Sequence, residues 1–149
     1  MNRAAIGALI PHAGDMCLLD SVVAWDSTTI ACLTSSHRSP GNPLSVDGRL
    51  DAICGVEYAA QAMAVHGGLI GNGRRPAAGY LASLRDVVCS VERLDLLKDD
   101  LLVTAELLIA DSASGIYRFN LTCGAIEVLS GRAAVVIDAG RSDTSRPNR

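Results

Sequence analysis

The chain has 149 residues, of which 49% are hydrophobic and 19% are charged, and its formal net charge is −3. These values are typical of one packed globular domain and exclude a disordered chain. They also give no basic surface for binding nucleic acid, and the apolar run that ends at Pro11 is too short to span a membrane.

The first half of the chain is predicted to contain two strands, a loop and a helix. Strands are favoured over 16–26 and 28–35, joined at Asp26-Ser27. The stretch 37–48 is dense in Pro, Gly, Asn and Asp, which indicates a loop. Apolar composition then predicts a long helix over 50–66, with Asp47 as its N-cap, followed by a glycine-rich loop over 67–79.

The second half is predicted to consist of strands over 80–90, 101–110, 116–125 and 131–138. Hairpin turns are expected at 111–115 and 129–131. One helix among mostly antiparallel strands is an α+β arrangement, which we expect to form a single domain over 1–139. The polar tail over 140–149 is expected to be disordered.

The five cysteines are scattered without a CxxC spacing, at positions Cys17, Cys32, Cys54, Cys89 and Cys123. Such a set is typical of buried free thiols in a reducing compartment. The N-terminal apolar run also makes a poor signal peptide. We therefore expect a cytoplasmic protein with no metal site.

The predicted helix contains a carboxylate, Glu57, although it has no continuous polar face. A helix that is apolar all round is expected to be buried, here by a sheet that curls around it. Burial disfavours the charged form, so we expect a raised pKa for Glu57 and a role as a general acid. The alternative is that Glu57 pairs with a hidden arginine or a backbone amide. His66 lies on a different side of the helix and is expected to interact with the last helical carbonyls.

Several stretches, taken in order, point to one family. They are IPHAGDMCLLDSVV at 10–23, an Asn-Pro-Leu loop at 42–44, GVEYAAQA at 55–62, and GYLASLRDVVCS followed by LKDDLLVTAELL at 79–90 and 97–108. Over about 10–138 the chain resembles the β-hydroxyacyl-acyl carrier protein dehydratases. It is most similar to the dehydratases predicted in aryl-polyene-type lipid clusters, in which an EYAAQA-like helix and an Asn/His-Pro-Leu loop are typical.

This resemblance implies a hot-dog fold, in which a curled antiparallel sheet wraps one long helix. It also implies a dimer whose active sites join the helix carboxylate of one subunit to a histidine of the other. The substrate thioester would arrive on the phosphopantetheine of an acyl carrier protein, with no other cofactor. Glu57 would protonate the departing hydroxyl group.

The chain departs from the best-known dehydratases in the loop before the helix, where Asn42 stands in place of the catalytic histidine. Asparagine cannot act as a base near neutral pH. His37 and His12 are therefore the candidate bases, although His37 could also be a solvated loop residue and His12 a structural turn contact. A substrate-binding role is expected for a second set, made up of Asn42, Pro43, Leu44 and Gln61.

An acidic carrier protein needs a basic docking surface. The candidates are Arg38, Arg74 and Arg75, with ordinary surface arginines as the alternative. We expect a homodimer or a hetero-pair with a related hot-dog subunit.

Three functions remain open from the sequence. The first is dehydration of β-hydroxyacyl thioesters in fatty-acid or polyene-type lipid biosynthesis. The second is thioester hydrolysis, with Glu57 activating a water that Asn42 positions. The third is a non-catalytic subunit that binds an acyl carrier protein or an active homologue.

Overall fold

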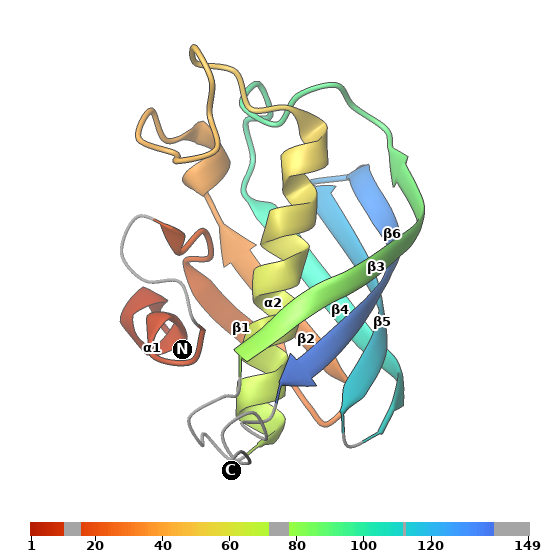
Figure 1. The fold of residues 1–149 in the computed structure, drawn as a ribbon. Helices are drawn as coiled ribbons and strands as arrows, with labels where there is room; N and C mark the ends of the chain where they lie inside the picture. The colour runs from red at the N-terminus through yellow and green to blue at the C-terminus, as the bar shows by residue number, and fades with distance from the viewer. Residues whose placement is uncertain (11–15, 72–77, 112, 139–149) are drawn as a thin grey trace, which may run out of the picture.

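One antiparallel sheet of six strands curls around a single long helix in this computed structural model (Figure 1). The structure describes residues 1–10, 16–71, 78–111 and 113–138. Within these ranges no helix is long and apolar enough to cross a membrane. The expected α+β arrangement of a wrapped helix is confirmed.

The sheet contains all six strands in the order β1-β2-β4-β5-β6-β3. Their bounds are Ser21–Trp25 for β1, Thr29–Thr34 for β2, Ala78–Cys89 for β3, Leu101–Ala110 for β4, Ser114–Cys123 for β5 and Ile126–Asp138 for β6. A short helix, α1 (Arg3–Gly7), precedes the sheet. Two 3₁₀ turns, η2 (Ser36–Arg38) and η3 (Ala52–Cys54), lie before the central helix α2 (Gly55–Ile70).

The central helix begins at Gly55, later than predicted, because tertiary hydrogen bonds hold the preceding residues. The carbonyl of Leu50 accepts from Leu94 N at 2.7 Å, and Ala52 N donates to the carbonyl of Glu92 at 3.0 Å. Asp47 has a φ of 53° in a turn, so its predicted role as the N-cap is wrong.

The same helix also ends later than predicted, since it runs through Gly67 and Gly68 to Ile70. Gly68 packs closely against Leu9, which follows α1. A Cβ built on Gly68 would lie 3.2 Å from Leu9 Cδ2. Close packing against the N-terminal segment thus stabilises the helix at Gly68, where local propensity favours a loop.

Strand β6 begins at Ile126, earlier than predicted, and the turn after β5 is formed by Gly124 and Ala125 rather than by 129–131. Gly124 has a φ of +59°, which suits a tight turn. Gly131 instead lies inside β6 beneath an aromatic ring, because a Cβ there would be 2.8 Å from Phe119 Cζ.

The packing of α2 against the sheet decides which helix residues remain accessible. Four of its residues, Tyr58, Ala59, Ala62 and Val65, are fully buried. None of the residues from 55 to 69 is exposed, but the opposite side of the helix is only half-buried. Glu57 lies on that half-buried side.

Glycine substitutions test this packing. Gly131→Ala should lower the free energy of unfolding by about 1–3 kcal/mol, because the new Cβ overlaps the buried Phe119 ring. Gly67→Ala is the matched control: a Cβ there meets nothing within 4 Å, so the better helix former should stabilise the protein by about 0.5–1 kcal/mol. Denaturant unfolding of both variants measures the effects, and stabilisation by Gly131→Ala would contradict the close contact.

Candidate functional site

Glu57 lies beside an amide whose orientation is fixed by backbone groups. Gln61, one turn further along α2, is 2% exposed. Its Oε1 accepts from Leu18 N at 2.8 Å, and its Nε2 donates to the carbonyl of Met16 at 2.7 Å. This arrangement directs the same NH₂ group to Glu57 Oε2, at 3.5 Å.

No arginine of the described ranges forms an ion pair with Glu57. Its hydrogen bond comes from a neutral amide instead. The alternative in which Glu57 pairs with a hidden arginine therefore finds no support in this part of the chain, and Glu57 remains a half-buried acid with a positioned hydrogen-bond donor.

Asn42 is buried and uses its amide within the chain. Its Nδ2 donates to the carbonyl of Ser36 and to Tyr58 Oη, both at 2.9 Å, and its Oδ1 accepts from Leu44 N at 2.8 Å. Tyr58 Oη also lies 2.9 Å from Ser36 Oγ. These bonds hold the loop before the helix against α2 at Tyr58, the residue that follows Glu57 in the sequence. A direct contact of Asn42 with substrate stays a prediction, as it does for Leu44, which is half-buried, and for Pro43, which is exposed.

His37 is 1% exposed, so the alternative of a solvated loop residue is wrong. Its Nε2 lies 3.1 Å from the carbonyl of Leu97 and must donate to it, while the buried Nδ1 has no partner. Burial lowers the pKa of His37 and so favours the neutral ring. No hydrogen bond joins His37 to Glu57 in the described structure.

The predicted docking residue Arg38 also interacts within the chain. Its guanidinium donates to the carbonyl of Lys98 at 2.7 Å and pairs with Asp100 at 2.9 Å, which ties η2 to the loop before β4. The other two predicted docking residues, Arg74 and Arg75, lie outside the described residues, as does the candidate base His12.

His66 is a buried structural residue that sequence reasoning placed wrongly. Because α2 continues to Ile70, the ring does not lie at the helix end. Nε2 donates to the carbonyl of Asp26 at 2.9 Å, which leaves Nδ1 to accept from Tyr117 Oη at 2.8 Å. The residue is 0% exposed, and burial lowers its pKa. The alternation of Tyr117 with exposed neighbours was the only sequence signal for this contact.

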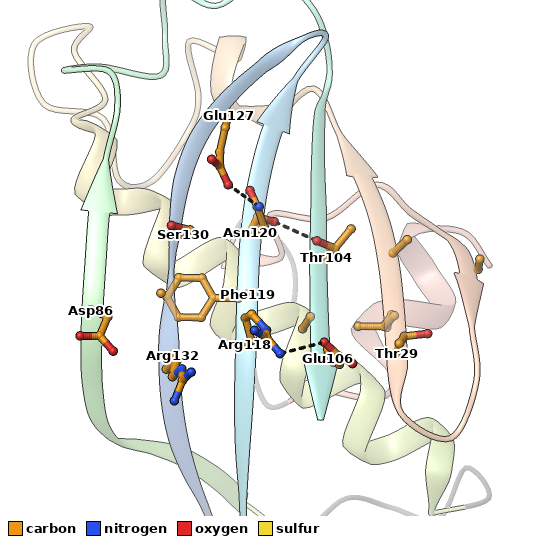
Figure 2. Close-up of a pocket in the computed structure, with 15 residues that line it drawn as sticks. Thr29, Asp86, Thr104, Glu106, Arg118, Phe119, Asn120, Glu127, Ser130 and Arg132 are labelled. Carbon is orange, nitrogen blue, oxygen red and sulfur yellow. Dashed lines mark hydrogen bonds and ion pairs between the residues drawn. The ribbon is translucent and has the colours of Figure 1, made fainter. Parts of the chain in front are cut away.

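A separate groove of about 880 Å³ lies on the outer face of the sheet, with α2 behind the strands (Figure 2). Its walls carry hydroxyl, amide and charged groups, including Thr104, Asn120, Ser130, Arg118 and Arg132. Neither Glu57 nor Gln61 lines it. The sheet therefore separates this groove from the helix carboxylate, and we place the candidate active site at Glu57.

Comparison with known proteins agrees with this architecture. A family model described as ApeP-like, ApeP dehydratase, matches residues 4–144. The fold is similar to the dehydratase heterocomplex ApeI:P from Xenorhabdus doucetiae, with a TM-score of 0.78, 24% identity, and 97% of this chain and 91% of that chain covered. No curated protein matches the chain in sequence.

Two thioesterases share the fold at lower similarity. A mutant thioesterase from Pseudomonas aeruginosa has a TM-score of 0.55 and 11% identity, with 78% of each chain covered. A hypothetical thioesterase from Streptococcus pneumoniae TIGR4 has a TM-score of 0.60 and 10% identity, with 80% of this chain and 85% of that chain covered. The expected hot-dog fold is confirmed.

The burial of His37 and His66 should make the free energy of unfolding depend on pH. Their folded-state pKa values lie below the ordinary value of 6.5, so the unfolded chain binds more protons as the pH falls through 6.5. The free energy of unfolding should therefore decrease from pH 7.5 to 5.5, by at most about 1.4 kcal/mol per pH unit for each histidine. His66→Gln, which keeps a donor for the Asp26 carbonyl, should reduce that slope. Denaturant unfolding at several pH values measures it, and an unchanged slope would contradict the assignment to His66.

Proposed function

The chain belongs to the ApeP-like dehydratase family, and on this premise we propose that it donates the catalytic acid of a β-hydroxyacyl-thioester dehydratase. The substrate is carried on the phosphopantetheine of an acyl carrier protein, and the reaction serves fatty-acid or polyene-type lipid biosynthesis. The observation that carries the proposal is Glu57, a half-buried carboxylate beside the fixed amide of Gln61.

The reaction needs an acid and a base. A base removes the proton next to the thioester carbonyl, and the electrons of that C–H bond form the new double bond. The bond to the β-hydroxyl group breaks as Glu57 gives up its proton, so that the hydroxyl leaves as water. Gln61 positions the Glu57 carboxyl through its amide, which itself is held by Leu18 N and the Met16 carbonyl.

The described residues include no exposed histidine that could act as the base. His66 is buried and both of its ring nitrogens are bonded within the chain. His37 is buried with its Nε2 on the Leu97 carbonyl, and its unpartnered Nδ1 is shielded from solvent. A second copy of the chain would bring the same buried rings. His12, outside the described residues, stays an in-chain candidate.

We therefore assign the base to a histidine of a related hot-dog subunit paired with this chain. The similar fold of the ApeI:P protein, which is a dehydratase heterocomplex, supports such a hetero-pair. Arg38, Arg74 and Arg75 stay the proposed docking residues for the acidic carrier protein. Pro43 and Leu44 stay the proposed substrate contacts in the loop that Asn42 holds.

The acid role of Glu57 is tested by Glu57→Gln in the assembled pair. Loss of a positioned general acid costs about 10²–10⁴ in rate, so dehydration of a β-hydroxyacyl-carrier thioester should fall by that factor. The substitution keeps the shape of the side chain, so folding and pairing should be unchanged. Glu127→Gln, an identical change at an exposed residue on the outer face of the sheet, is the control and should leave turnover as in wild type.

Other outcomes of the same assay would contradict the proposal. Full activity in Glu57→Gln would make Glu57 a structural acid. Release of free thiol without formation of the double bond would indicate a thioesterase. Absence of turnover at every chain length, with the pair intact, would indicate a non-catalytic subunit.

A further inference from the structure

One edge of the sheet is not covered by any of the described residues. At the other edge, β1 is joined to the N-terminus, since Val22 N donates to the carbonyl of Met1 at 3.0 Å and Asn2 forms a bridge with Ser21. Strand β3, by contrast, pairs only with β6 among the described residues. It is 12 residues long and carries the exposed apolar side chains Leu84 (40%) and Val88 (57%). A long free edge of this kind is a site for pairing with another strand.

Three arginines from adjacent strands form a row that ends at this edge. Arg118 of β5 lies opposite Arg132 of β6, and Arg132 lies opposite Arg85 of β3. Directly opposed residues share one face of a sheet, here the outer face shown in Figure 2, where Arg118 and Arg132 are drawn. Neighbouring strands are about 4.8 Å apart, and like charges directly opposite each other are destabilising.

Arg85 and Arg132 differ from the other arginines of the described ranges in lacking a carboxylate partner. Arg118 pairs with Glu106 at 3.5 Å. Each of the remaining four arginines pairs with an aspartate; they are Arg3, Arg38, Arg49 and Arg93. Asp86 lies on β3 near this face, but no ion pair joins it to Arg85 or Arg132. Arg85 and Arg132 therefore have no carboxylate in ion-pair contact, although Asp86 lines the same groove as Arg132.

A second copy of the chain would increase this repulsion. When two identical strands pair antiparallel about a two-fold axis, residues near the axis meet their own counterparts. Arg85 lies inside β3. If the two-fold axis of such a pair passes within one residue of Arg85, the two Arg85 side chains lie opposite or diagonal to each other. Their separation would be about 5–8 Å on the same face. Three adjacent arginines would become six.

We propose that Arg85 makes the β3 edge selective for a different chain, a related hot-dog subunit with an Asp or Glu facing Arg85 on the outer face of its own edge strand. The carboxylate would neutralise the end of the arginine row, whereas the arginine of a second copy repels it. This inference rests on the proposed function, in which the chain forms a hetero-pair. It adds that a carboxylate facing Arg85 is what selects the partner.

The test uses the chain itself as the acidic partner. Arg85→Glu supplies a carboxylate on the same edge strand, so a mixture of wild type and Arg85→Glu should associate about threefold to tenfold more tightly than either protein alone at low salt. The gain should disappear near 1 M salt, where charges are screened within about 3 Å. Sedimentation velocity with one labelled protein measures both dissociation constants.

Two further variants complete the experiment. Lys98→Glu makes the same change in net charge at an exposed residue of the loop between β3 and β4, and its mixture with wild type should show no gain. Arg85→Ser removes the repulsion without adding an acid, so it should self-associate more tightly than wild type. It keeps the idea testable if Arg85→Glu folds poorly.

The inference is wrong if wild type self-associates as tightly as the mixture, if the gain survives high salt, or if no combination associates at 100-fold the concentration at which the natural pair forms. These measurements need no substrate. If Glu57→Gln proves fully active, the proposed function is wrong, but the association measurements still test the role of Arg85. If the Arg85→Glu mixture shows no gain while the hetero-pair is an active dehydratase, only the inference about Arg85 is wrong.

Discussion

The close approach of α2 to the sheet is the constraint on which the site depends. At the first turn of the helix a Cβ on Gly55 would lie 3.0 Å from Leu121 Cδ2 and 3.1 Å from Leu129 Cδ2, so the helix backbone packs directly on these two leucine side chains of β5 and β6. This contact fixes the rotation of the helix. Glu57 is thereby turned to the half-buried side, next to the segment that holds Gln61.

The chain uses its other polar groups near the helix to hold itself together. Asn42 bonds to Tyr58 and to its own loop, and His37 and His66 donate to backbone carbonyls. Asn42 and His66 thus use their polar groups within the chain, whereas the Nδ1 of His37 is buried and has no partner. In the described part of the chain no exposed histidine accompanies the proposed acid Glu57, and this gives the proposed pairing with a second subunit a chemical reason.

The fold could be predicted because its signals are local, whereas most of the site could not. Alternating residues gave the bounds of β4, and the apolar stretch around Glu57 gave a wrapped helix. The helix ends depend on Leu94 and Leu9, which no local pattern identifies. Likewise, the burial of His37 depends on the Leu97 carbonyl, 60 positions away, and the role of Asn42 depends on Tyr58. Propensity and periodicity carry no information about such distant partners.

The central claim is that acid and base lie on different chains. The structure of the assembled hetero-pair tests it most directly, through the distance from the Glu57 carboxyl to the nearest histidine of either subunit. We predict that a partner histidine faces Glu57 across a cavity open to the thioester, with no protein atoms between the two groups. A partner that covers Glu57 with apolar side chains, or pairs it with an arginine, would contradict the account.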